Sequence, residues 1–403
     1  MKYVVILGDG MADYPQEILK GKTPLAVANK PYIDELAKKS ELGLVRTVPF
    51  GMKPGSDVAN LSVLGYDPKE SYTGRSPLEA ASIGISLTET DVTARANLVT
   101  LSNEENFADK TMVDYSAGEI STKEARELIE YLKKHLDNEI YTLYSGVSYR
   151  HCLVIKDGEI AGDMVPPHDI TGKPIKEYLP KSEKGKKLLS LMEKSVELLK
   201  NHPINKKRIL EGKNPATSIW LWGEGTKPNL QSFSDRFGLK AGMISAVDLL
   251  KGIGKLTEMK VIEVEGATGT YQTNFLGKAN AVLSALDDGL DFIYIHMEAP
   301  DECGHHGDLK NKIYSIEQID EKVVKVIVDG LKERGEEFSI LIAPDHPTPI
   351  ATMTHAVDPV PFMIYRSTVN EGNGADRYDE KECQKTNLFV DDGVALMKKF
   401  LNK

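Results

Sequence analysis

The chain has 403 residues, of which 41% are hydrophobic and 27% are charged, a balance typical of soluble globular proteins. At roughly 100–200 residues per domain, this length predicts about two domains. The formal net charge is −10, so we expect neither nucleic acid nor a membrane surface as a partner, because both are anionic and would be repelled overall. An anionic small substrate can still bind where cations line its site.

The three cysteines, Cys152, Cys303 and Cys383, are scattered and form no Cys-x-x-Cys pair. Neither a disulfide framework nor a cysteine-based zinc site is therefore expected, and a reducing compartment fits best. The apolar run at residues 3–7 is too short for a signal peptide, and no later run approaches the roughly 18 apolar residues that a membrane span needs. We expect a cytoplasmic protein.

The first element is an apolar, β-branched run at residues 3–7, closed by Gly8-Asp9-Gly10. This pattern predicts a strand that is buried on both faces of a parallel sheet. Asp9 would then stand at the carboxyl end of the strand, where open α/β sheets bind their ligands. The alternative is an ordinary turn aspartate before glycine.

A second signal follows the break at Pro54-Gly55, where Ser56-Asp57 precedes apolar residues at helical spacing. Ser56 is predicted to be the N-cap of this helix. A serine at a helix N-terminus is also well placed to act as a nucleophile that accepts a phosphoryl group, because the free N–H groups and the helix dipole stabilise phosphate. The sequence leaves both interpretations open.

The pattern of elements changes after Arg75 and returns near residue 239. Between these points the sequence predicts strands at 92–101 and 149–155 and helices at 122–135 and 186–199. The flanking parts alternate strands and helices, which indicates βαβ units and a mostly parallel sheet. The predicted strands there are 292–297, 338–343 and 361–366, and the predicted helices are 32–39, 278–286 and 316–331. We therefore predict an α/β fold in which residues 77–232 form an inserted α+β module.

Acidic residues and histidines follow two of the buried strands. Asp301 and His305 come after residues 292–297, Asp345 and His346 come after 338–343, and His355 lies in the proline-rich turn beyond. A single histidine here would most simply be a satisfied loop residue, but the group together indicates a metal site. Mixed carboxylate and imidazole ligands favour Mn²⁺, Zn²⁺ or Mg²⁺. Two such ions could polarise a phosphoryl group and activate a serine hydroxyl.

Glu302 and His306 accompany these residues. We expect them at the surface or supporting the ligands.

Taken together, the segments LGDGMAD, PGSDVANLSVLGYDP, YTGRSPLEA, PDECGHHGD, PDHPTP and THAVDPVPF resemble the cofactor-independent phosphoglycerate mutases of the archaeal type, within the alkaline phosphatase superfamily. The resemblance extends over nearly the whole chain. It implies an alkaline-phosphatase-like three-layer domain with a mostly parallel sheet, interrupted by an inserted α+β substrate domain. Residues 1–76 and 233–403 would form the metal-binding catalytic domain, and residues 77–232 would bind substrate.

The same resemblance implies a role for each matching residue. Ser56 would be the nucleophile that carries the phosphoryl group, so that no 2,3-bisphosphoglycerate is needed. One divalent ion would be held by Asp9, Ser56, Asp345 and His346, and the other by Asp301, His305 and His355. Mn²⁺ is the most expected ion, with Mg²⁺ or Zn²⁺ as alternatives. The candidates for binding substrate phosphate and carboxylate are Arg75, Arg95, Arg150 and Lys251, although any one arginine could instead form a surface ion pair.

The implied activity is the glycolytic isomerisation of 3-phosphoglycerate and 2-phosphoglycerate through phosphoserine. Some positions differ from the family pattern. Gly223-Glu224-Gly225 stands where arginine is expected, Asn60 stands where histidine is common, and Glu119 stands where a basic residue or histidine is common. None of these positions is a predicted metal ligand, so the differences affect which substrate is expected and not the metal site. One alternative is therefore a homoserine kinase of the same superfamily, using ATP. A non-catalytic protein with structural ions is another, but structural zinc sites are usually built from Cys and His.

Overall fold

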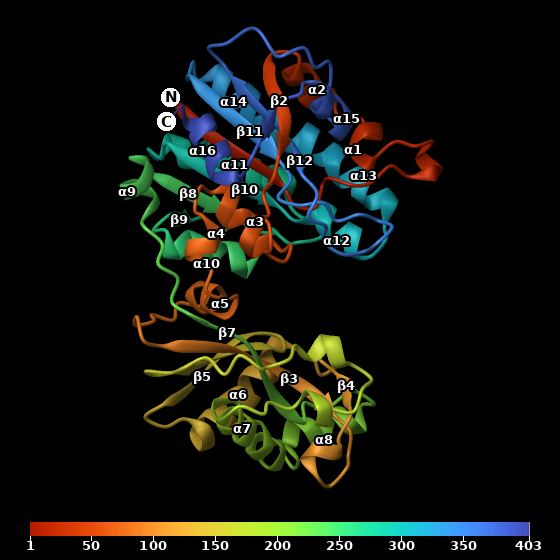
Figure 1. The fold of residues 1–403 in the computed structure, drawn as a ribbon, viewed down its shortest axis with the longest axis vertical. Helices are drawn as coiled ribbons and strands as arrows, with labels where there is room; N and C mark the ends of the chain where they lie inside the picture. Colours follow the sequence, from red (N-terminus) through yellow and green to blue (C-terminus); the bar gives the residue numbers. More distant parts are fainter. Residues whose placement is uncertain (403) are drawn as a thin grey trace. The chain divides into compact units, whose positions relative to one another are not determined.

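The computed structural model describes residues 1–402. The chain divides into two compact units, each followed along the ribbon in Figure 1. The sheet unit consists of Met1–Tyr72 and Asn229–Lys403, and the inserted unit is Thr73–Pro228. The sequence placed the insertion at 77–232.

The sheet unit is organised around an eight-stranded sheet with the order β13-β2-β12-β11-β1-β10-β8-β9 within residues 1–402. Its strands are β1 (Lys2–Gly8), β2 (Ser40–Val45), β8 (Ala241–Ile244), β9 (Lys260–Val261), β10 (Phe292–Met297), β11 (Phe338–Ala343), β12 (Val360–Arg366) and β13 (Phe389–Val390). β12 pairs antiparallel with β11 and β2, and the other neighbours are parallel. The predicted α/β fold with a mostly parallel sheet is confirmed.

Helices cover both faces of this sheet, which gives three layers (Figure 1). Val4 and Ile6 of β1 belong to a core that also includes residues of the long helices on that side. On the other face, Tyr3 packs against Phe400 and Phe292 packs against Phe233. The two faces of β1 are therefore both buried, as its continuous apolar run predicts.

The helices of the sheet unit are α1 (Pro24–Val27), α2 (Pro31–Ala37), α3 (Ser56–Val63), α4 (Pro68–Ser71), α9 (Phe233–Phe237), α10 (Asp248–Leu256), α11 (Phe275–Asp287), α12 (Ala299–His305), α13 (Leu309–Gln318), α14 (Lys325–Glu333), α15 (Glu380–Lys385) and α16 (Gly393–Leu401). The helix predicted at 316–331 is part of a longer one. It begins with α13, passes through a π-helical stretch at Ile319–Val324, and ends with α14. Within the π-helical stretch, the Asp320 carboxylate accepts the backbone N–H of Ile33 at 2.6 Å and so satisfies a free donor at the start of α2.

The inserted unit has a separate antiparallel sheet and a separate hydrophobic core. Its strands are β3 (Val92–Leu101), β4 (Met112–Asp114), β5 (Tyr141–Val147), β6 (Arg150–Ile155) and β7 (Ser218–Thr226). Its helices are α5 (Ser76–Ser82), α6 (Thr122–Leu136), α7 (Glu183–Leu199) and α8 (Pro203–Leu210). β3 lies between β6 and β7, and every residue of β3 is buried.

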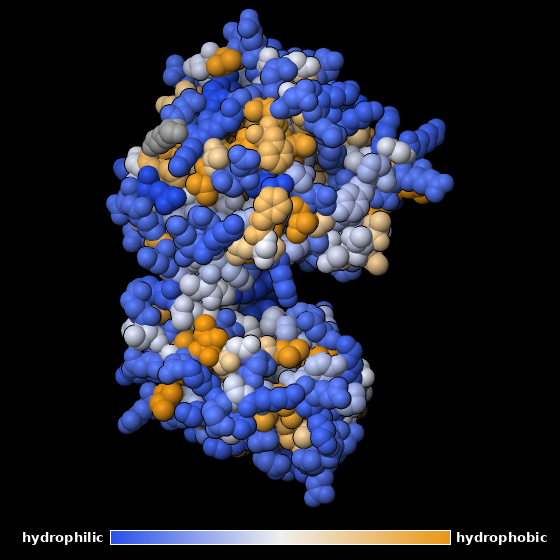
Figure 2. Space-filling model, viewed as in Figure 1, coloured by the Kyte–Doolittle hydropathy of each residue, from blue (hydrophilic) through white to orange (hydrophobic). Residues whose placement is uncertain are grey.

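The surface in view in Figure 2 is mainly hydrophilic, with single apolar side chains between the polar ones. Within residues 1–402, no helix combines the length and the apolar character that crossing a membrane would require.

Candidate active site

The acidic and histidine residues singled out in the sequence meet at the carboxyl edge of the central strands. Asp9 follows β1, Asp345 follows β11, and Asp301 lies in the first turn of α12, directly after β10. β11, β1 and β10 are adjacent and parallel, so their carboxyl ends lie at the same edge of the sheet. Asp9, Asp301 and Asp345 are all buried, with at most 6% of their surface exposed.

The first cluster consists of Asp9, Asp345 and His346, which offer ligand atoms within 4.8 Å of one another. His346 Nε2 lies 3.4 Å from Asp345 Oδ2 and 3.7 Å from Asp9 Oδ1. Ser56 Oγ lies 3.2 Å from the same nitrogen. Ser56 is the first residue of α3, and Gly55 occupies the N-cap position without a side-chain bond. The prediction that Ser56 is the helix N-cap is wrong, because its hydroxyl is turned to His346 instead.

The second cluster consists of Asp301, His305 and His355. His305 Nε2 and His355 Nε2 are 2.9 Å apart, and they lie 3.3 and 3.4 Å from the two carboxylate oxygens of Asp301. His305 Nδ1 lies 3.0 Å from the backbone carbonyl of Met353. A proton on Nδ1 that is donated to this carbonyl leaves Nε2 as a lone-pair ligand facing the cluster.

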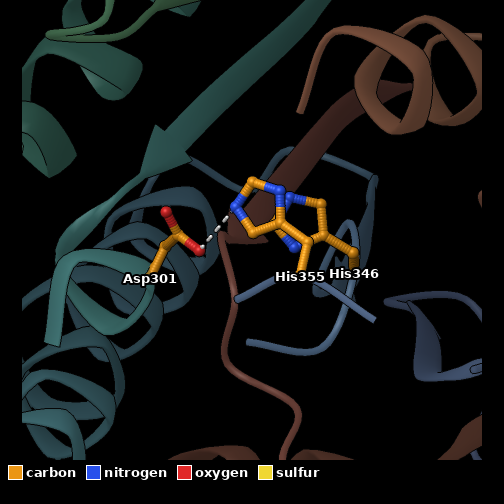
Figure 3. Close-up of side chains that lie close together, drawn as sticks. All are labelled: Asp301, His346 and His355. Atoms are coloured by element: carbon orange, nitrogen blue, oxygen red, sulfur yellow. Dashed lines mark ion pairs between the residues drawn. The ribbon is translucent and has the colours of Figure 1, made fainter. Parts of the chain in front are cut away.

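His346 joins the two clusters. Its ring stacks on that of His355 with centroids 3.9 Å apart, and Asp301, His346 and His355 also offer ligand atoms within 4.8 Å of one another. Figure 3 shows the two rings overlapping beside the Asp301 carboxylate. The two groups of ligands therefore adjoin and form one continuous site.

A positive charge would stabilise the buried carboxylates of the site. Burial and the nearby carboxylates of Asp345, Asp301 and Glu298 raise the pKa of Asp9 well above its ordinary value. Asp9 Oδ1 is buried and has no hydrogen-bond partner in the part of the chain that the structure describes. A buried carboxylate oxygen without a donor is costly. A divalent cation beside Asp9 would supply the missing partner, so the residues present fit a metal site.

Asn60 supports the first cluster from α3. Its Nδ2 donates to Asp345 Oδ2 at 2.9 Å and to the Ser56 carbonyl at 2.8 Å, while its Oδ1 accepts the hydroxyl of Tyr294 at 2.6 Å. Asn60 is fully buried. Its side-chain hydrogen bonds thus go to the Ser56 carbonyl, to the predicted ligand Asp345 and to a strand of the sheet, which indicates a supporting role at the first cluster.

His296 is a further residue of this site, and the motifs did not single it out. It lies inside β10 and is fully buried, and its Nε2 is 2.8 Å from Asp9 Oδ2. The signal that could have found it is a lone ionisable side chain in the otherwise apolar run FIYIHM. Such a residue is rarely buried without a partner.

Comparisons with known proteins show the family of this chain. The family model described as 2,3-bisphosphoglycerate-independent phosphoglycerate mutase matches residues 37–205. A protein of Geobacter sulfurreducens named as a probable mutase of this kind is 49% identical over 100% of both chains. One of Methanothrix thermoacetophila, named as such a mutase, is 50% identical over 99% of both. This chain belongs to that family. The predicted family resemblance is confirmed.

Two solved structures have a similar fold over the whole chain. The PH0037 protein of Pyrococcus horikoshii has a TM-score of 0.83 and 31% identity, with 100% of this chain and 97% of that chain covered. The cofactor-independent phosphoglycerate mutase of Thermoplasma acidophilum has a TM-score of 0.67 and 25% identity, with 100% and 99% covered.

Within the inserted unit, Glu79 brings two of the predicted substrate arginines together. Arg75 Nε and Arg95 Nε each lie 2.9 Å from a different oxygen of this carboxylate. Burial opposes ionisation of Glu79, but Arg95 and Arg75 outweigh it and hold its pKa below the ordinary value. Arg95 also packs over the Trp222 ring, and burial lowers its pKa to about 10. Arg150 is the first residue of β6, which lies between β3 and β5, and it is exposed.

Lys251, the fourth residue predicted to bind substrate, lies in α10 of the sheet unit and pairs with Glu263 at 2.8 Å. His306 is exposed and contacts Glu302, as expected for residues at the surface. Glu224 stands in the segment where the family pattern would have arginine. Its carboxylate accepts the backbone N–H groups of Ala161 and Gly162, both at 3.0 Å, so it holds the loop that follows β6.

Proposed function

We propose that this protein interconverts 3-phosphoglycerate and 2-phosphoglycerate by passing the phosphoryl group through Ser56. The observation that carries the proposal is the position of Ser56 Oγ, 3.2 Å from His346 Nε2 at the junction of two carboxylate–imidazole clusters. The relatives that match the whole chain are named as 2,3-bisphosphoglycerate-independent phosphoglycerate mutases. The alternative of a homoserine kinase is not favoured, because the names and the family model point to the mutase.

The ligands fall into two sets in this proposal. The first ion would be held by Asp9, Ser56, Asp345 and His346, and the second by Asp301, His305 and His355. We expect Mn²⁺, and Mg²⁺ or Zn²⁺ also suit ligands of this mixed type. When bound, such ions neutralise phosphate charge and lower the pKa of a coordinated hydroxyl. The unpaired oxygen of buried Asp9 and the facing Nε2 atoms of His305 and His355 support this assignment.

Ser56 then acts twice. In the first half, Ser56 Oγ loses its proton and attacks the phosphorus of 3-phosphoglycerate. The bond from Oγ to phosphorus forms, the bond from phosphorus to the C3 oxygen breaks, and the C3 oxygen takes a proton and becomes a hydroxyl of glycerate. In the second half, the C2 hydroxyl loses its proton and its oxygen attacks the phosphorus of phosphoserine, and the released Ser56 Oγ takes a proton again. The phosphate is held at the start of α3, where backbone N–H groups lack helical partners. Because Ser56 carries the phosphoryl group, no 2,3-bisphosphoglycerate is required.

The sheet unit supplies this chemistry, and we assign substrate binding to the inserted unit. Arg75, Arg95, Arg150 and Lys251 are the residues that we assign to the phosphate and carboxylate of the substrate. A guanidinium binds either anion through two parallel N–H···O bonds, which fixes orientation as well as charge. We also place the protein among the enzymes of glycolysis in the cytoplasm.

The test uses metal-stripped protein reconstituted with Mn²⁺ and supplied with 3-phosphoglycerate, followed by ³¹P NMR. We expect 2-phosphoglycerate to form and Ser56→Ala to lower turnover by about 10³-fold or more, since the nucleophile is lost. Ser56→Ala should keep the wild-type circular dichroism spectrum and bind Mn²⁺. The control is Ser232→Ala, which removes a helix-capping serine of the same unit and should leave turnover unchanged. Turnover by Ser56→Ala, or phosphorylation of homoserine by ATP in place of isomerisation, would contradict the proposal.

A further inference from the structure

His296 is a buried histidine that has no direct role in the proposed phosphoryl transfer. Every residue of β10 is buried, and His296 has no exposed surface. Burying an imidazole is costly unless its nitrogens find partners. Both nitrogens have one: Nε2 lies 2.8 Å from Asp9 Oδ2, and Nδ1 lies 3.2 Å from Ser245 Oγ.

Asp9 and Ser245 together determine which nitrogen of His296 carries the proton. As a cation ligand Asp9 is ionised and can only accept, so His296 Nε2 must donate to it. Ser245 Oγ, which accepts the backbone N–H of Val247 at 3.0 Å, then donates its own O–H to His296 Nδ1. The ring proton is then on Nε2 and is donated to Asp9 Oδ2. This arrangement orients the ring as well as the proton, because Asp9 holds one ring nitrogen and Ser245 holds the other.

The backbone of His296 is fixed as well. Lys278 Nζ, itself buried, donates to the His296 carbonyl at 3.1 Å. β10 pairs in parallel register with β1, which places His296 beside Leu7, two residues before Asp9. The donor to Asp9 is therefore held by the sheet and not by a loop.

The two oxygens of Asp9 consequently have different roles. Oδ2 is engaged by His296, whereas Oδ1 has no hydrogen-bond partner within residues 1–402 and lies 3.7 Å from His346 Nε2, toward the first cluster. With Oδ2 engaged, the carboxylate cannot rotate freely and presents one defined oxygen to the cluster. A buried ligand held by a hydrogen bond to its second oxygen loses less freedom when it binds an ion.

We propose that His296 is a positioning residue that holds Asp9 in the orientation needed to bind the first cation, with Ser245 holding the other ring nitrogen. The inference rests on the proposed function, in which Asp9 is a cation ligand. His296 itself is not a ligand in this account, because both of its nitrogens are engaged. If His296 served only to fill the core, replacing it would change stability without selectively changing the affinity for one ion.

The experiment compares side chains that differ in reach. His296→Gln keeps an N–H near the position of Nε2, whereas His296→Asn is polar but too short to reach Asp9, and His296→Leu removes the donor. His151→Leu is the control, since His151 is also a buried strand histidine whose Nδ1 accepts a backbone N–H, but it lies in the inserted unit. Mn²⁺ affinity and stoichiometry are measured on each metal-stripped protein by free-ion EPR titration, alongside urea unfolding.

We expect His296→Leu and His296→Asn to weaken one of the two Mn²⁺ sites by about 10–100-fold and to leave the other near the wild-type value. His296→Gln should recover most of that affinity, and His151→Leu should lower stability without changing Mn²⁺ binding. Equal Mn²⁺ affinity in His296→Asn and His296→Gln would overturn the inference, whether or not His296→Leu folds. So would a wild-type protein that binds no Mn²⁺.

The same measurements separate this inference from the proposed function. If the variants show the expected differences in Mn²⁺ affinity but the wild-type protein does not isomerise 3-phosphoglycerate, the role of His296 is supported and the mutase activity is contradicted. If the wild-type protein isomerises 3-phosphoglycerate but replacing His296 does not change the Mn²⁺ affinity, only the role of His296 is contradicted.

Discussion

At the scale of single residues, Asp9 and Glu380 of the sheet unit have raised pKa values for different reasons. Asp9 is buried among other acids, and their repulsion adds to the effect of burial. Glu380 is raised to about 7 mainly by burial, although its oxygens accept from Thr23 Oγ1 and the Asp13 backbone N–H. Glu380 contacts none of the predicted metal ligands in the described part of the chain. Its titration should therefore appear in stability and not in cation binding.

Replacing Glu380 with Gln should remove a pH dependence of stability. The pKa of Glu380 is raised from 4.5 to about 7 on folding, so the folded state favours the protonated form. The associated stability is fully present below about pH 4.5 and is lost as the pH rises through 7. We expect Glu380→Gln, which imitates the protonated acid, to gain about 1–3 kcal/mol relative to wild type between pH 5 and pH 8. Urea unfolding of both proteins across this range measures the difference, and parallel curves would contradict it.

At the scale of elements, the turn after β1 determines how closely the carboxyl ends of the strands approach. Gly10 has φ +61, and its backbone N–H donates to Asp345 Oδ1 at 3.2 Å. A Cβ at this position would lie 2.7 Å from both the Cα and Oδ1 of Asp301. Only glycine allows β1 to end in this conformation with α12 so near. The turn thus brings Asp301 close to the loop that carries Asp9.

Gly10→Ala should therefore damage cation binding as well as the fold. We expect a loss of about 1–3 kcal/mol of stability from the strained φ and the clash. The affinity for Mn²⁺ should also fall, because Asp301 must move. Gly21→Ala is a matched control, since Gly21 has φ +75 but nothing lies within 4 Å of its added Cβ. Thermal unfolding and Mn²⁺ titration of both variants give the comparison, and equal Mn²⁺ affinity in the two would contradict a role of the close approach.

At the scale of the whole molecule, the inserted unit has the features of a part that can fold by itself. The inserted unit has a core of buried residues around Leu98, Leu128, Leu191 and Trp220. Its two ends are adjacent, because Thr73 Oγ1 donates to the Thr226 carbonyl at 2.5 Å. A continuous segment with a separate core and adjacent ends has the usual properties of an independent domain.

We accordingly expect residues 73–228, expressed alone, to fold. The fragment should unfold in a single cooperative transition in urea and give dispersed amide resonances by NMR. Leu128→Ala offers a control within the fragment, since a fully buried leucine of α6 should cost about 2–5 kcal/mol. A fragment that shows no cooperative transition, or one that Leu128→Ala does not affect, would contradict an independent core.

The sequence by itself determined the elements whose pattern is local. The bounds of β10 and β11 match the predicted strands, because continuous apolar runs with turn residues at their ends leave little choice of position. The bounds of β3 also match, although Arg95 and Asn97 interrupt its apolar residues. The candidate ligands were also found from the sequence, since acids and histidines that follow parallel strands meet at one sheet edge. The structure brings Asp9, Asp301 and Asp345 together there.

Only the tertiary structure decided the partners of each side chain. Ser56 has the sequence of a helix cap, yet its hydroxyl is turned to His346, which is 290 residues away. Asn60 contacts Asp345 and Tyr294, and His296 contacts Asp9. These contacts depend on strand order and register, which local patterns do not encode. For that reason the sequence identified the groups that carry the chemistry, whereas the fold decided which groups orient them.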